Sequence, residues 1–242
     1  PFYLFALGAL FVIFLITKQK SPPITKVKDD FKKISLFDNR VWPFLIVSAS
    51  FGICNAALVQ TSSFYFQDVI DPHSTNFIAL ASVGFMLSAL GILNGQLLIA
   101  DRLQTSPGSL IRLGILFMFF SLLGVANSTS LVHIYISLFF YGLGGGMLGP
   151  GISASLSLSV GKENQGSASG FLGMVIPVGH VISPIISMPL YTINPSCPYL
   201  LGSCLMLFCF IFVLSNQRHK WIRKKNYRKD HETYTEEPSD LP

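Results

Sequence analysis

Residues 141–191 read YGLGGGMLGPGISASLSLSVGKENQGSASGFLGMVIPVGHVISPIISMPLY, two long uncharged runs rich in Gly, Ser and Pro. A short polar patch from Gly161 to Gly166 separates the two runs. In a soluble helix each glycine would cost about 1 kcal/mol relative to alanine, and the prolines would break the hydrogen-bond ladder. Membrane helices use small residues for close backbone approach, and their neighbours accommodate kinks. The stretch therefore predicts two membrane helices.

The composition predicts the same class for the whole chain. Hydrophobic residues make up 50% of the 242 residues, charged residues make up 12%, and the mean hydropathy is +0.54. Soluble domains carry about 25% charged residues. We therefore expect an all-α integral membrane protein whose first partner is the lipid bilayer. The formal charge of +5 does not indicate nucleic-acid binding, because the basic residues lie in segments that flank the apolar runs.

Catalytic and metal-binding patterns are missing from the sequence. The four cysteines, Cys54, Cys197, Cys204 and Cys209, have no metal-ligand spacing, and we expect them to be packing or lipid-facing residues. The glycines from Gly142 to Gly151 lack the Lys-Ser/Thr of a phosphate loop and lie within an apolar run. We therefore expect neither an enzyme nor a bound cofactor or metal.

Seven apolar runs predict seven membrane helices. The first, residues 1–17, nearly crosses a hydrocarbon core of about 30 Å at about 1.5 Å per residue. We interpret it as a spanning helix cut at its outer end, in a fragment of a longer polypeptide, because the chain begins inside this run without Met. A basic linker follows at 18–40, and the other runs form a six-helix unit within 41–216. These runs are 41–66, 77–100, 110–126, 131–160, 167–191 and 199–214.

The positions of the basic residues predict the topology. If the linker is cytoplasmic, successive crossings place all 17 Lys and Arg residues on the cytoplasmic side. The tail, residues 217–242, changes from basic to acidic without an apolar period, so we expect it to be cytoplasmic and disordered. The sequence thus predicts a multi-pass protein of the plasma or inner membrane.

One motif in the last long run resembles the drug:proton antiporters of the major facilitator superfamily. Their signature is G-x(8)-G-x(3)-G-P-x(2)-G-G, normally on helix five. Here the same spacing is occupied by Gly170, Gly179, Ser183-Pro184 and Ser187-Met188. Ser replaces two of the glycines of that signature and Met replaces the last one. By the internal repeat of the two halves, this copy resembles the counterpart on helix eleven.

Two further passages are similar to motifs of the same family. The segment from Leu97 to Arg102 resembles the G-x-L-A-D-R loop, and the segment from Lys162 to Gly170 resembles the E-x-x-G-x-A-x-G entry to helix eleven. Together they resemble helices six to twelve of a twelve-helix transporter, so the N-terminal half would be a missing partner. The resemblance implies alternating-access transport of a small molecule, most simply proton-coupled efflux of drugs or amphipathic compounds. It also implies that the coupling carboxylate lies in the missing half.

His180 is the clearest candidate for a transport residue. It is an ionisable group about midway along a predicted span, where such groups are costly and often functional. It could contact substrate or take a proton, and the alternative is a neutral imidazole that is hydrogen-bonded to a neighbouring helix. We expect the following polar residues either to line a cavity or to bond between helices: Asn55, Gln60, Tyr141 and Asn94.

The resemblance assigns conformational roles to other residues. Asp101 and Arg102 would form a cytoplasmic gate or hinge contact, whereas Gly170, Gly179 and Pro184 would serve helix contact and bending. Three alternatives stay open at this point. They are an uptake symporter of the same fold, an exporter of a siderophore or metabolite, and, from another class, a seven-helix receptor or non-transporting membrane scaffold.

Overall fold

The computed structural model describes residues 10–15, 17–18, 34–73, 75–101 and 106–215. Residues 10–15 and 17–18 are helical and belong to a separate unit, Pro1–Lys32, while every other described element belongs to the second unit, Lys33–Pro242. Most of the predicted first span, the linker up to residue 33 and the tail 217–242 lie outside the described residues. The comparison with the sequence therefore concerns the other six spans.

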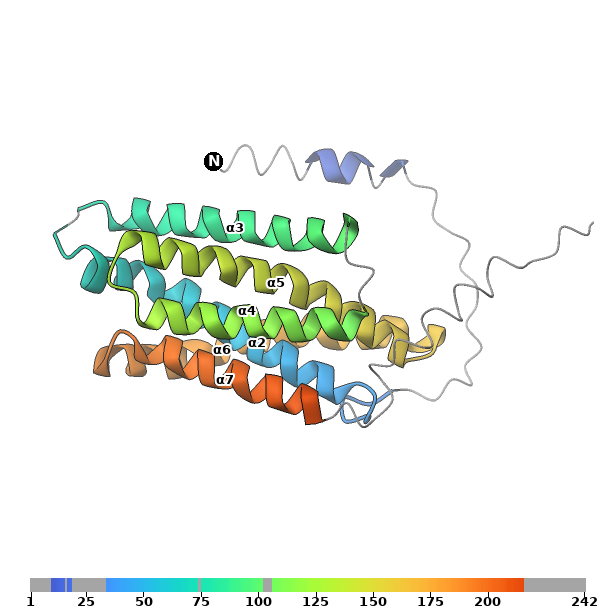
Figure 1. Cartoon of the computed structure of the whole chain (residues 1–242). Helices are drawn as coiled ribbons and strands as arrows, with labels where there is room; N and C mark the ends of the chain where they lie inside the picture. The colour runs from blue at the N-terminus through green and yellow to red at the C-terminus, as the bar shows by residue number, and fades with distance from the viewer. Residues whose placement is uncertain (1–9, 16, 19–33, 74, 102–105, 216–242) are drawn as a thin grey trace, which may run out of the picture. The chain divides into compact units, whose positions relative to one another are not determined.

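Six long helices make up the second unit and agree closely with the six predicted runs (Figure 1). Each is long and apolar enough to cross a membrane, and the described residues contain no strand. The prediction of an all-α, multi-pass membrane protein is thereby confirmed. The helices are α2 (Trp42–Tyr65), α3 (Phe77–Asp101), α4 (Pro107–Ala126), α5 (Leu131–Ser159), α6 (Gln165–Ile193) and α7 (Cys197–Ser215).

Two boundaries differ from the prediction by three residues or more, for identifiable reasons. Helix α4 begins at Pro107, three residues early, because proline suits the first position of a helix, where its missing N–H is not needed. Helix α2 does not end at Phe66 but continues through a π-helical turn, Phe66–Ile70. Asp68, which lies beyond the predicted run 41–66, therefore belongs to a helical extension of the span.

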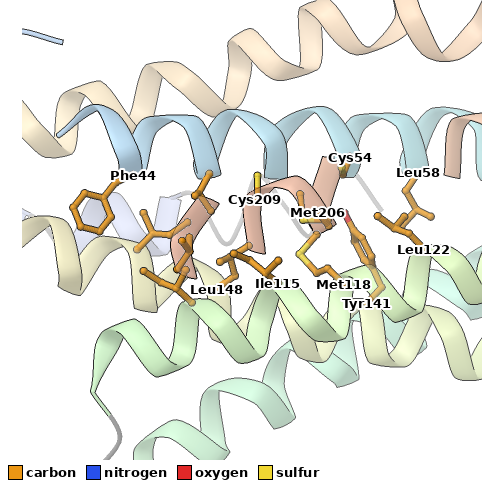
Figure 2. Close-up of a cluster of buried hydrophobic side chains, with 14 of the residues drawn as sticks. Phe44, Cys54, Leu58, Ile115, Met118, Leu122, Tyr141, Leu148, Met206 and Cys209 are labelled. Atoms are coloured by element: carbon orange, nitrogen blue, oxygen red, sulfur yellow. The ribbon is translucent and has the colours of Figure 1, made fainter. Parts of the chain in front are cut away.

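The helices pack as a bundle around one hydrophobic core. Helix α5 packs between α3 and α4, α2 packs against α6, and α7 packs against α4 and α2. The core takes side chains from α2, α4, α5 and α7, among them Phe44, Ile115, Met118 and Leu148 (Figure 2). Cys54 and Cys209 are buried in this core as free thiols, as expected for packing residues.

Glycine pairs allow the helices to cross closely. A Cβ atom on Gly114 would lie 2.8 Å from the Gly144 carbonyl oxygen, and one on Gly144 would lie 2.7 Å from the Gly114 oxygen, where α4 crosses α5. At the crossing of α2 and α6, a Cβ on Gly179 would lie 2.8 Å from the Ile53 nitrogen. Real Cβ atoms do not approach backbone this closely, so these crossings require glycine. The Gly-rich composition noted in the sequence thus serves helix contact.

Buried polar side chains join the helices at the end of the bundle where α2 finishes. The Tyr65 hydroxyl donates to the Ser128 carbonyl at 3.1 Å, and the Thr61 hydroxyl donates to the Tyr199 hydroxyl at 2.9 Å. The rings of Tyr65 and Tyr199 meet edge to face at 5.1 Å. Each bond links different segments of the chain, so this network fixes α2 and α7 to the connection between α4 and α5.

The opposite end of the bundle carries the described basic residues that flank these helices. Arg40 pairs with Asp38 at 3.0 Å, and this hydrogen-bonded contact raises the pKa of the Arg40 guanidinium. The Ser159 hydroxyl donates to the Arg40 carbonyl at 3.2 Å, which ties the end of α5 to the start of α2. Such an exposed ion pair contributes about 0.2–1 kcal/mol, so the packing of the helices matters more here.

Two alanine substitutions on α6 test the role of the glycine crossing. Gly179→Ala places a methyl group against the backbone of α2, and we expect it to reduce the free energy of unfolding by about 1–3 kcal/mol. Gly170→Ala is the matched control, since a Cβ there meets nothing within 4 Å. Melting temperatures of the whole polypeptide in detergent check this. Equal melting temperatures for the two variants would contradict it.

Candidate transport surface

Helices α3 and α6 are far less covered than the others. Within the most apolar stretch of α3 only 17% of residues are buried, the same share as in α6, against 61% for the span that contains α2. Large apolar side chains on both helices are exposed, for example Met86 and Leu93 on α3 and Val181 and Ile185 on α6. These two helices therefore present the surfaces that the described chain leaves uncovered.

A second kind of uncovered surface is made of small residues on α5 and α6. On α5, small residues that are at least partly exposed recur at every fourth position: Gly145, Gly149, Ser153 and Ser157. On α6 the exposed small residues include Gly166, Gly170 and Gly173. A Cβ on Gly149, or on any of these three α6 glycines, would meet nothing within 4 Å. We call these seven residues the open small-residue face.

The two halves of this face meet at the end of the bundle that carries Lys162. The Gln165 side-chain amide donates to the Ser157 carbonyl at 3.3 Å, so the start of α6 lies beside the end of α5. Farther along α5, a Cβ on Gly145 would lie 3.6 Å from the ring of Phe51 on α2. The face is therefore bordered by α2 as well as by the two helices that form it.

His180 is exposed on α6, as a transport role would require. Its Nδ1 atom lies 3.0 Å from the Ile176 carbonyl oxygen one turn earlier in its own helix, and not on a neighbouring helix. Pro184 has no N–H to donate to the His180 carbonyl, so the ladder of α6 is interrupted at this position. His180 thus sits where α6 is both uncovered and irregular.

The other predicted cavity residues divide by environment. Asn55 is partly exposed on α2, and Asn94 is exposed on α3 with its amide donating to the Leu90 carbonyl at 2.8 Å. Gln60 is partly exposed, but its Oε1 atom is buried without a hydrogen-bond partner among the described residues. Tyr141 is only 4% exposed and lies in the core near Met118 and Leu122 (Figure 2). This position does not favour contact of Tyr141 with a substrate.

The antiporter-like motif is divided between two environments. Gly179, Ser183 and Ser187 are buried, and the Ser183 hydroxyl donates to the Ile53 carbonyl of α2 at 3.0 Å. Gly170 belongs to the open face, and Pro184 is partly buried. Asp101 ends α3, but its side chain and the whole of Arg102 lie outside the described part of the structure. Their role as a gate stays a prediction.

A small apolar pocket between α2, α6 and α7 lies apart from the open face. Its lining includes Ile53, Cys54, Ser187, Leu201 and Gly202. With almost no polar surface, it offers little to orient a substrate. The described residues also hold no group of three or more His, Cys, Asp or Glu side chains that could bind a metal ion.

One polar contact was not foreseen from the sequence. The Tyr191 hydroxyl at the end of α6 donates to the Asp68 carboxylate at 2.9 Å. The predicted span 41–66 ends before Gln67 and Asp68, whereas the helix continues to Ile70. The sequence does permit this longer helix, because no helix-breaking residue occurs between Phe66 and Pro72.

Comparison with known proteins places this arrangement in a family. The family model of the Major Facilitator Superfamily matches residues 1–184 and also residues 99–236. No curated protein matches the sequence. The fold is similar to the POT family transporter PepTSo, with a TM-score of 0.64 and 18% identity over 74% of this chain and 37% of that one.

A second solved structure, a mutant of the peptide transporter POT in complex with sulfate, gives a TM-score of 0.67. The identity is 12% over 84% of this chain and 45% of that one. The chain thus spans less than half the length of both structures. At these identities the likeness concerns the fold, and the match to the family model covers more than half of the sequence. The chain belongs to the Major Facilitator Superfamily.

Proposed function

We propose that this chain is the C-terminal half, with helix six, of a transporter that moves a small molecule by alternating access. The observation that carries the proposal is the open small-residue face of α5 and α6. Even with an added Cβ atom, Gly149 and the three α6 glycines of this face would contact nothing within 4 Å. Close packing within the described unit therefore does not explain why these positions are glycine. They do leave room for a substrate or for an approaching helix.

The uncovered sides of α3 and α6 support a second half as partner. In a monomeric membrane unit, lipid alone could cover apolar faces such as that of α3. Helix α6 differs, because its open glycines, three internal prolines and exposed His180 suit a protein-lined or water-lined surface better than acyl chains. The chain spans 37% and 45% of the two solved transporters, which leaves length for such a half.

The same residues support an amphipathic substrate. A surface of small and apolar residues with a few polar groups, here His180 and Asn55, suits a compound with a large apolar part. With the antiporter-like motif, this favours proton-coupled efflux of drugs or related compounds. Peptide transport or another uptake symport is the second candidate, because one of the solved structures is a POT family transporter and the other is a peptide transporter. Export of a siderophore or metabolite would use the same surface.

We further propose that the Lys162 end faces the cytoplasm, with the linker and the tail on that side. Arg40 precedes α2, Arg112 lies in the second turn of α4, and Lys162 precedes α6. Helices α2, α4 and α6 thus each have a basic residue near their first turn, at the same end of the bundle. The connections at the other end contain no Lys or Arg. This asymmetry matches the known bias of cytoplasmic loops.

Transport is tested with the whole polypeptide in cells or proteoliposomes. We expect cells that express it to accumulate less of a cationic or amphipathic fluorescent dye, and a protonophore to abolish the difference. Greater accumulation would support uptake instead. No difference for dyes, dipeptides or metabolite mixtures relative to cells without the protein would contradict the transport function.

Substitutions at His180 and Tyr141 test which surface meets the substrate. We expect His180→Ala to change the substrate range or the pH dependence of transport, because the imidazole is exposed beside the open face. Tyr141→Phe is the control, since the buried hydroxyl has no partner among the described residues, and its removal should leave transport unchanged. The measurement is transport rate against pH at equal expression. A larger effect at Tyr141 than at His180 would contradict this assignment.

A further inference from the structure

The π-helical turn at the end of α2 begins on a firm anchor. Phe66 is 0% exposed, its ring lies 5.9 Å from that of Tyr135 on α5, and its N–H bonds to the carbonyls of both Ser62 and Ser63. The turn closes with the Asp71 N–H donating to the Phe66 carbonyl at 3.0 Å. Motion of this turn must therefore take place beyond Phe66.

Beyond Phe66, the turn is held by a contact with α6. The Asp68 carboxylate accepts the Tyr191 hydroxyl bond of 2.9 Å, and the Tyr191 ring lies 6.3 Å from that of Phe64, one turn earlier on α2. A hydrogen bond to an ionised carboxylate is about twice as strong as one between neutral groups. This contact lies farther along α2 and its π-helical extension than the crossing at Gly179 and the Ser183 bond to Ile53.

Among the described residues, the Asp68 carboxylate has one hydrogen-bond partner, the Tyr191 hydroxyl. Asp71 and His73 follow it in the connection, and Tyr65 and Tyr199 are the ionisable groups of the neighbouring network. No Lys or Arg occurs between residues 41 and 101, or between 163 and 217, so neither α2 nor α6 offers Asp68 a cation. The carboxylate thus depends on the Tyr191 hydroxyl for an interhelical bond.

The lengths of the two spans and the polar connections next to this contact indicate where it lies relative to the membrane. The span from Trp42 to Ile70 has 29 residues and α6 also has 29. At about 1.5 Å per residue each measures about 43 Å, whereas the hydrocarbon core is about 30 Å thick. The π-turn and Tyr191 lie at the ends of these spans next to the polar connections 71–76 and 194–196, so we place their bond at the membrane surface, where it can open without exposing polar groups to lipid.

We propose that Asp68 and Tyr191 form a latch that holds the π-helical turn, Phe66–Ile70, against α6 and that opens during the transport cycle. π-helical turns are rare in proteins, and those that occur are often found at functional sites. An α-helical register competes with the π-helical one at this turn. Release of Asp68 frees the turn to change register or unwind beyond its Phe66 anchor. The end of α2 then separates from α6 while the Gly179 crossing keeps the rest of the pair together.

Hydrogen exchange in the whole polypeptide tests the latch itself. Tyr191→Phe removes the hydroxyl but keeps the ring against Phe64, and we expect amides 67–71 to exchange at least tenfold faster. Asp68→Asn keeps an acceptor oxygen and should have a smaller effect. Thr192→Val is the matched control, because the Thr192 hydroxyl bonds only within its own helix, to the Pro189 carbonyl at 2.8 Å. Unchanged exchange in Tyr191→Phe would overturn the proposal.

A reversible cross-link tests whether the latch opens. Asp68→Cys and Tyr191→Cys are joined by a short bis-thiosulfonate reagent in a variant whose Cys197 and Cys204 are replaced by Ser. We expect cross-linking to reduce the transport rate at least tenfold, with full recovery after reduction by dithiothreitol. An unchanged rate in the linked protein, or failure of the two cysteines to link, would overturn the proposal.

The role of the latch in the cycle rests on the proposed transport function, and the two can fail separately. If the unlinked variant and the parent protein both move no substrate, the transport function fails. The hydrogen-exchange result still decides whether Tyr191 holds the turn. If transport is present and the cross-link leaves it unchanged, the proposed latch fails while the transport function stands.

Discussion

The close crossing of α2 and α6 at Gly52 and Gly179 is the contact on which the arrangement of α6 depends. A Cβ on either residue would lie 2.8 Å from a backbone atom of the other helix. Between membrane helices apolar surfaces gain little from association, because lipid is as apolar as a side chain, so close packing and interhelical hydrogen bonds must hold them. The glycine crossing brings the backbones near enough for Ser183 to reach the Ile53 carbonyl.

Small residues serve two opposite purposes in α5 and α6. On α5, Gly144 faces α4 in tight contact, whereas Gly149, little more than one turn later, meets nothing. On α6 the same contrast separates Gly179 from Gly170. The buried glycines hold neighbouring helices together. The open glycines leave a surface near His180 that carries no bulky side chains. Both features fit the proposed role as half of a transporter, in which the helices of one half are held together while a second surface admits substrate or another helix.

The sequence predicts the helices well because each apolar run ends at polar or helix-breaking residues, as at Asn127 and Pro195. It predicts their packing poorly. Both sides of α5 and α6 are apolar or small, so no periodicity shows which glycines are in contact, and Gly170 and Gly179 look equivalent within one motif. Tyr141 shows the same difficulty, because an aromatic side chain with a hydroxyl suits a cavity and a core equally. The Asp68 turn was missed because polar residues end most of the predicted spans, whereas here the helix continues through Gln67 and Asp68 to Ile70.

The central claim is that the open small-residue face meets water during transport, and thiol labelling measures this directly. In the whole polypeptide, with Cys197 and Cys204 replaced by Ser, Gly170→Cys should react with a charged, water-soluble thiol reagent in proteoliposomes. Met118→Cys, in a core position that is 0% exposed, should not react. Addition of a transported substrate should slow the reaction of Gly170→Cys. If Gly170→Cys reacts no faster than Met118→Cys, the face does not line a transport path.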